Sequence, residues 1–295
     1  MILLAVEVSD PSIGYSIIDV FFGINIFIMA VIVSLMIFII IYRNHRNIRN
    51  SGLSSSILIL IGLLFIEISV TLTCFNLNAI ICTFIDIFLV VGISFVISTL
   101  AAKLYRIYRI FQNPTARAVH ISDKDLFIFT CFITLGAGIL FILYATLGGG
   151  LQALTKTADL NPLYEFKICL VPDEAIQITF LILFYVYFLS LFIAAGILAI
   201  LTRKTMKDFN ESWDVGFVVY SWIVVTMIYA PIFYLQGNST NSNETMYAIR
   251  FIGITLVQIL TLGFLFFNKV KKVIRSELKA KKSNENDQLI FTTNN

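Results

Sequence analysis

The chain has 295 residues, of which 58% are hydrophobic and only 13% are charged, and its formal net charge is +3. Soluble domains carry about 25% charged residues, so this composition, with a mean hydropathy of +0.89, excludes an ordinary soluble fold. The apolar residues gather in near-continuous blocks without strict polar alternation, and each block can cross about 30 Å of hydrocarbon as a helix. We therefore expect an all-α membrane protein.

Seven such blocks follow one another along the sequence. They cover residues 16–42, 55–75, 81–108, 125–147, 174–202, 214–236 and 246–268. The pattern predicts a seven-transmembrane helix bundle over 16–268, preceded by a short extracellular segment, 1–15, and followed by a tail, 269–295, that is basic at first and then disordered. An odd number of spans places the two chain ends on opposite sides of the membrane.

Lys and Arg are distributed unevenly between the two sides of the predicted bundle. All but three of the 21 lie around the ends of the first, third, fifth and seventh blocks, and the exceptions are Lys156, Lys167 and Arg250. Because cytoplasmic loops retain basic residues, we expect the N-terminus outside and the tail in the cytoplasm. Glycosylation acceptor motifs at Asn238 and Asn243 lie in a predicted outer loop and agree with this orientation, although such tripeptides also arise by chance.

Two of the four cysteines are predicted to face the outside. Cys82 opens the third span, and Cys169 lies in the long outer loop before the fifth. Both meet an oxidising compartment, where a disulfide persists, so we expect a bridge between this loop and the third span. Cys74 and Cys131 lie within spans, where a lone cysteine usually acts as a small apolar filler.

Polar side chains inside the predicted spans mark a candidate transmembrane pocket. Glu67 lies about twelve residues into the second span, Asp86 lies one turn below Cys82, and Gln258 lies in the seventh span. Intramembrane carboxyl groups are costly and often functional. The structural alternative is a neutral Glu67 hydrogen-bonded to Gln258 or to Asn25, with Asp86 reaching the outer headgroups.

The sequence offers little support for catalysis. The two histidines, His45 and His120, lie in predicted cytoplasmic loops, and common protease, hydrolase and phosphate-binding motifs are absent. We therefore expect neither an enzyme nor a metal or other cofactor, and no nucleic-acid partner.

Opposite charges are predicted at the cytoplasmic ends of the third and sixth spans. Lys103 lies 21 residues after Cys82, about 31 Å along a helix, and so reaches the inner boundary. Glu211 precedes the sixth span at a matching depth. A pair in a partly dehydrated cleft would hold the two spans together. The alternative is that Lys103 extends to lipid phosphates while Glu211 is solvated.

Several segments resemble the class C G-protein-coupled receptors, the metabotropic glutamate and GABA-B family. The third span ends in GISFVISTLAAKLYRIYRIF, residues 92–111, which is similar to the family segment G-F-x-L-x-x-x-x-L-x-x-K-x-x-R-x-x-R-I-F. The sixth span opens with FNES, residues 209–212, followed by Gly216 and Tyr220, and later contains PIFY, residues 231–234. The similarity extends over about residues 16–275. It also matches Cys82 and Cys169 to the family's loop disulfide.

The resemblance implies a mechanism and partners. It implies that Lys103 and Glu211 form an ionic lock whose opening exposes a cleft for a heterotrimeric G protein. A basic rim would face the G protein or anionic membrane lipid, and it consists of Arg106, Arg109, Arg203 and Lys269. The family also dimerises, so a homodimer or heterodimer is expected.

The large outer domain in which these receptors bind ligand is not found in this chain, so the resemblance does not identify the extracellular ligand. We expect a plasma-membrane receptor that transmits a signal from an extracellular ligand or partner subunit to a G protein. The alternatives are a seven-span transporter or a non-signalling subunit of a receptor dimer.

Overall fold

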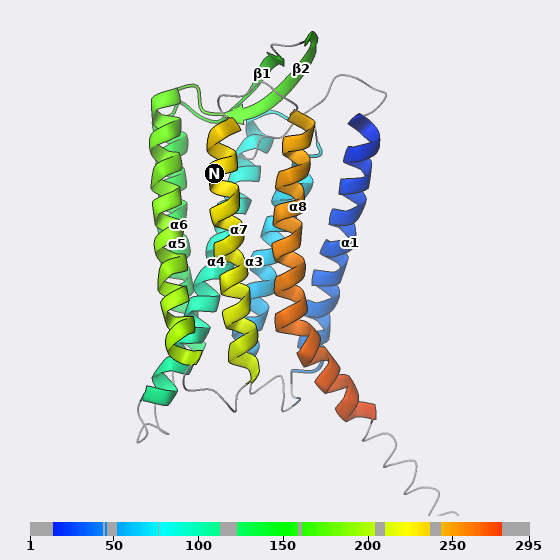
Figure 1. The fold of residues 1–295 in the computed structure, drawn as a ribbon, viewed down its shortest axis with the longest axis vertical. Coiled ribbons are helices and arrows are strands. Elements are labelled where there is room, and N and C mark those ends of the chain that lie inside the picture. Colours follow the sequence, from blue (N-terminus) through cyan, green and yellow to red (C-terminus); the bar gives the residue numbers. More distant parts are fainter. Residues whose placement is uncertain are drawn as a thin grey trace, which may run out of the picture.

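The computed structural model describes residues 14–43, 45, 52–75, 77–112, 123–158, 161–203, 210–236 and 243–278. These residues form long helices that run side by side, with one β-hairpin across one end (Figure 1). The helices are α1 (Gly14–Ile41), α3 (Leu53–Leu72), α4 (Ala79–Gln112), α5 (Asp123–Leu147), α6 (Glu174–Arg203), α7 (Asn210–Gln236) and α8 (Asn243–Leu262), and α8 runs into the π-helical segment η1 (Gly263–Phe267). We call the two ends of the bundle the hairpin end and the tail end.

The predicted helical membrane architecture is confirmed in its coarser form. Six of the described helices are long and apolar enough to cross a membrane, because their spans hold 20 or more residues of high hydropathy. Within α7 the described apolar stretch is shorter, Trp213–Ile228. The seventh span and the orientation in the membrane therefore stay predictions.

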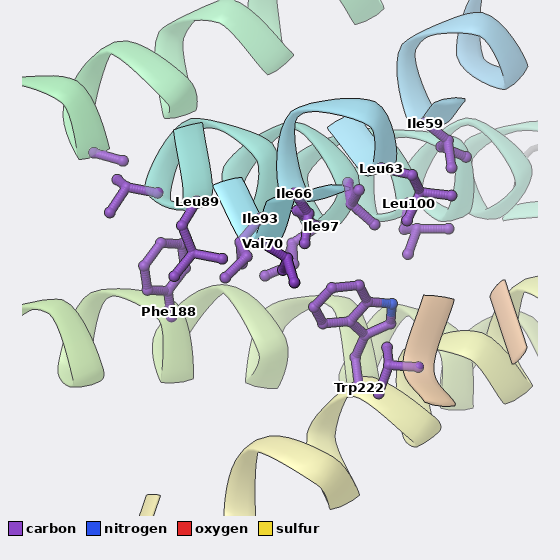
Figure 2. Close-up of a cluster of buried hydrophobic side chains, with 14 of the residues drawn as sticks. Ile59, Leu63, Ile66, Val70, Leu89, Ile93, Ile97, Leu100, Phe188 and Trp222 are labelled. Carbon is purple, nitrogen blue, oxygen red and sulfur yellow. The ribbon is translucent and has the colours of Figure 1, made fainter. Parts of the chain in front are cut away.

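Helix α4 lies at the centre of the bundle and contacts α3, α5, α6 and α7. Its buried side chains Leu89, Ile93, Ile97 and Leu100 pack against α3, and Phe188 of α6 and Trp222 of α7 complete the cluster (Figure 2). Such a helix needs apolar residues on most of its circumference, which explains its near-continuous hydrophobic sequence.

Two glycines let α3 and α4 approach each other at backbone distance. A Cβ added to Gly92 would lie 2.7 Å from Ile66 Cγ1 and 2.8 Å from the Gly62 carbonyl oxygen, and one added to Gly62 would lie 3.0 Å from the Gly92 carbonyl oxygen. Small residues are what close helix packing in membranes requires. The two helices are therefore packed backbone against backbone at this point.

The predicted outer loop before α6 is not irregular. It forms an antiparallel hairpin of β1 (Gln152–Ala158) and β2 (Asn161–Leu170), and the hairpin crosses the end of the bundle (Figure 1). A disulfide joins Cys169 of β2 to Cys82 of α4, with both residues fully buried. The hairpin is thereby tied to the central helix.

The last helix does not end where the apolar block ends. The backbone passes through η1 and continues as α-helix over residues 268–278, so the first part of the predicted tail is helical. A π-helical turn accommodates one extra residue within a helix and often accompanies function. It changes the direction in which the following side chains project.

Candidate functional site

Lys103 lies at the tail end of α4 and is only 7% exposed. Its helix contacts both α6 and α7. Glu211 is the second residue of α7, but its side chain lies outside the described part of the structure. The burial of an ammonium group at this position is unusual unless anions or carbonyl groups surround it. The Lys103–Glu211 pair itself stays a prediction.

The predicted basic rim also falls at the tail end. Lys269 donates a hydrogen bond from Nζ to Ser56 Oγ over 3.1 Å, and Arg109 lies over the ring of Tyr105, 5.8 Å from its centroid. Arg106 lies near the start of α3, because a Cβ added to Gly52 would be 4.0 Å from its guanidinium. The fourth member, Arg203, ends α6, and its side chain is outside the description.

Side-chain hydrogen bonds that the sequence did not predict connect this end of the bundle. Asn268 donates to Asp214 of α7 over 3.3 Å, and the ring nitrogen Nε2 of His45 lies 2.6 Å from Ser276 Oγ. These contacts join residues far apart in the sequence, so no local pattern could have identified them. They connect the helical residues 268–278, which we call the α8 extension, to α7 and to the chain after α1.

A further link lies deeper, between α7 and α8. Trp222 donates from its indole Nε1 to Thr261 Oγ1 over 3.1 Å, and both side chains are buried. Trp222 also stacks on Phe192 of α6, with ring centroids 6.3 Å apart. The indole therefore connects three helices through one polar and one aromatic contact.

The structure places Glu67 and Asp86 at the same depth on neighbouring antiparallel helices. Ser69 Oγ donates to the Ile85 carbonyl oxygen over 2.7 Å, which fixes the register of α3 against α4 and puts Glu67 opposite position 87. Both carboxyl groups are buried, at 1% and 3% exposure. Glu67 lies five residues before α3 ends, nearer the hairpin end than the bilayer centre expected from sequence.

Gln258 lies at nearly the same depth on α8. Lys269, which follows α8 and η1, contacts Ser56 of the antiparallel helix α3. Gln258 lies eleven residues before Lys269 and Glu67 lies eleven residues after Ser56, so both lie about 16 Å nearer the hairpin end. Gln258 is fully buried. The predicted pocket residues Glu67, Asp86 and Gln258 therefore share one layer of the bundle, about one helical turn thick.

The predicted glycosylation acceptors are not settled by the structure. Asn238 lies outside the described residues, and Asn243 is the first residue of α8, with its side chain also outside the description. Both stay predictions.

Known proteins resemble this chain along most of its length. The family model described as "7 transmembrane sweet-taste receptor of 3 GCPR" matches residues 14–269. Metabotropic glutamate receptor 8 of Mus musculus is 27% identical over 244 residues, which are 79% of this chain and 26% of the receptor. Metabotropic glutamate receptor-like protein G of Dictyostelium discoideum is 25% identical over 212 residues, 70% of this chain and 27% of that protein.

The chain thus spans about a quarter of the length of these relatives. The match extends from the start of α1 to Lys269 and includes every helix from α1 to η1. The matched family is one of receptors and not of enzymes, and with its membrane-length helices the chain is a multi-pass protein of the plasma membrane. It belongs to the class C G-protein-coupled receptor family, whose transmembrane domain it contains.

Proposed function

We propose that this chain transmits a signal across the plasma membrane to a heterotrimeric G protein. An extracellular ligand or a partner subunit acts at the hairpin end, and the tail end opens between α4 and α7. Ligand binding then shifts a two-state equilibrium in favour of the open form. The family membership supports this role, and the geometry of Lys103 supports the mechanism.

The proposed orientation puts the hairpin outside and the tail end in the cytoplasm. Lys103, Arg106, Arg109 and Lys269 lie at the tail end, and basic residues are retained on the cytoplasmic side. The disulfide lies at the opposite end, where an oxidising compartment would preserve it. Glycosylation of Asn238 and Asn243 on the hairpin side is part of the same proposal.

The main support for this mechanism is the burial of Lys103. Lys103 is 7% exposed and lies in the last third of α4, where a buried lysine side chain needs anionic or carbonyl partners for its ammonium group. Glu211 is the second residue of α7, and α7 contacts α4. We infer that the two charges form a lock that holds α7 against α4, and that its opening exposes the surface to which the G protein binds.

The basic rim around this opening suits an acidic partner. Arg109 is exposed, and Arg106 and Lys269 are half-buried at the same end. Positive charges here would attract a partner helix through its carboxylate-bearing end, and anionic lipid would bind the residues at the periphery.

Charge reversal tests the lock. Purified protein in lipid nanodiscs would be mixed with a heterotrimeric G protein, and the rate of nucleotide exchange measured. We expect Lys103→Glu and Glu211→Lys each to raise the ligand-free exchange rate, because each places like charges at the α4–α7 contact. The double variant restores an opposite pair and should return the rate to that of the unmodified protein.

The matched control is Lys272→Glu, which reverses a charge on an exposed side chain of the α8 extension and should leave the exchange rate unchanged. If the single variants behave like this control in a protein that supports exchange, the lock is wrong. Absence of exchange in all variants, together with solute uptake into vesicles, would instead identify a transporter.

A further inference from the structure

Helix α1 joins the layer that contains Glu67 and Gln258. Phe21 of α1 stacks on Phe251 of α8 with ring centroids 4.3 Å apart, and α1 also packs along α3. Asn25 lies one turn after Phe21, and Gln258 lies two turns after Phe251, each on the same face as its ring. The helical rise then puts Asn25 and Gln258 within about 5 Å in depth.

Asn25, Glu67 and Gln258 lie on buried faces of α1, α3 and α8, and α1 contacts both of the other helices. Asn25 shares the buried stripe of α1 with Ile28 and Ile32, on a helix that is otherwise largely exposed. Glu67 follows Ser56 by eleven residues and shares its face of α3, the face that Lys269 of α8 contacts. Asn25, Glu67 and Gln258 have exposures of 1%, 1% and 0%.

Polar atoms of all three residues have no hydrogen-bond partner among the described residues. They are Asn25 Nδ2, Glu67 Oε2, and both Oε1 and Nε2 of Gln258. Leaving a buried polar atom unsatisfied costs about 1–3 kcal/mol, and buried polar groups in native proteins usually have partners. Several such atoms in one layer therefore indicate a polar guest bound between the helices.

The charge of the layer indicates what kind of guest this is. Helices α1 and α3 contain no Lys or Arg, and α8 carries its basic residues at Arg250, two turns above Gln258, and from Lys269 onward. Asp86 of α4 adds a second carboxyl group at the depth of Glu67. An ionised carboxylate at membrane depth needs a compensating positive charge.

We propose that Asn25, Glu67 and Gln258 bind a sodium ion. Glu67 Oε2 and Gln258 Oε1 supply hard oxygen ligands, and rotation of the Asn25 amide group presents its oxygen in place of the nitrogen. The negative field of Asp86 strengthens the attraction. The site lies closer to the hairpin end of the bundle, which in the proposed orientation faces the sodium-rich side of the membrane.

A divalent ion fits the layer less well. Calcium takes six to eight oxygen ligands, several of them carboxylates. Among the described residues, no group of three or more His, Cys, Asp or Glu side chains could hold a metal ion. One carboxylate and two neutral amides have a net charge of −1, which one monovalent cation neutralises.

The test compares sodium with choline at equal ionic strength. Protein purified in nanodiscs would be unfolded by heat while its tryptophan fluorescence is recorded. At a sodium concentration about ten times the dissociation constant, we expect the melting temperature to rise by about 3–5 °C. Sodium NMR relaxation measured on the same unmodified protein should show an exchangeable bound ion.

Glu67→Gln keeps the shape of the side chain and removes its charge, so it should abolish both the thermal response and the bound-sodium signal. The control Glu277→Gln neutralises an exposed acid on the α8 extension and should keep both. Equal melting temperatures in sodium and choline with no bound sodium would overturn the proposal, and so would stabilisation by calcium but not sodium. If Glu67→Gln does not fold, the NMR result on the unmodified protein decides. Neither measurement depends on G-protein coupling.

Discussion

The α3–α4 interface and the interfaces of α8 are built in opposite ways. Between α3 and α4 the contact is mainly apolar, apart from the Ser69–Ile85 hydrogen bond, and so close that neither Gly62 nor Gly92 has space for a Cβ. Helix α8 is connected to its neighbours by individual side-chain hydrogen bonds, among them Trp222–Thr261, Asn268–Asp214 and Lys269–Ser56.

This difference separates a fixed part of the bundle from an adjustable one. Backbone-to-backbone packing has one geometry, since any sliding of α3 past α4 creates clashes or voids. Hydrogen bonds between long polar side chains can be exchanged for others at small cost. We therefore expect α3 and α4 to act as a frame, and α7 and α8 to be the helices that shift during signalling.

The largest expected effect comes from breaking the frame. Gly92→Ala adds a methyl group that would lie 2.7 Å from Ile66 and 2.8 Å from the Gly62 carbonyl oxygen, and overpacking of this kind costs about 1–3 kcal/mol. The melting temperature in nanodiscs should fall by several degrees.

A matched control is available on α5. A Cβ at Gly138 would have no atom within 4 Å, and alanine favours a helix over glycine by about 0.8–1.0 kcal/mol. Gly138→Ala should therefore leave the melting temperature unchanged or raise it. If the two alanine variants lowered it equally, close packing at Gly92 would not be the reason for its glycine.

An intermediate effect is expected at the α7–α8 link. Thr261→Val keeps the shape of the side chain but removes the oxygen that accepts the hydrogen bond from Trp222, so the buried indole N–H is left unpaired at a cost of about 1–2 kcal/mol. Thermal unfolding would measure the loss, and Thr261→Ser, which restores the hydroxyl, should recover most of it. Equal stability of the valine variant and the unmodified protein would show that this link is dispensable.

The smallest effect is expected at the tail end. Ser56→Ala removes the acceptor of the Lys269 hydrogen bond, but Lys269 keeps its contact with the ring of Phe266, whose centroid is 5.7 Å away. We expect a loss of less than about 1 kcal/mol together with faster hydrogen exchange in residues 268–278. A destabilisation as large as that of Gly92→Ala would contradict the distinction between frame and adjustable helices.

The sequence predicts the helical part of this architecture well because length and apolarity determine which segments can cross a bilayer. The helices α5 and α6 coincide with the predicted blocks to within a few residues. The sequence does not predict the hairpin before α6, since residues 152–170 carry no apolar alternation strong enough to distinguish strands from a loop. Its stability depends instead on pairing and on the Cys82–Cys169 bridge.

The candidate sites were predictable by residue type but not by contact. Glu67, Asp86 and Gln258 stand out as polar residues within apolar blocks, and Lys103 stands out by its position at a span end. That Glu67, Asp86 and Gln258 lie in one layer depends on the register of the helices, which contacts such as that of Ser69 with Ile85 determine. The hydrogen bonds of Asp214 with Asn268 and of Ser276 with His45 could not be predicted either. Hydrophilic residues near span ends are common, and these partners are distant in the sequence.

Separation of α7 from α4, which opens the tail end in the proposed mechanism, can be measured directly. Spin labels at Tyr105 of α4 and Trp213 of α7, both exposed, would report the distance between the two helices by pulsed electron resonance, after replacement of Cys74 and Cys131. In the protein with the unmodified charge pair we predict a single short distance between the two labels. In Lys103→Glu a second population with a longer distance should appear, and adding Glu211→Lys should restore the short distance alone. An unchanged distance in Lys103→Glu that nevertheless accelerates nucleotide exchange would contradict the opening mechanism.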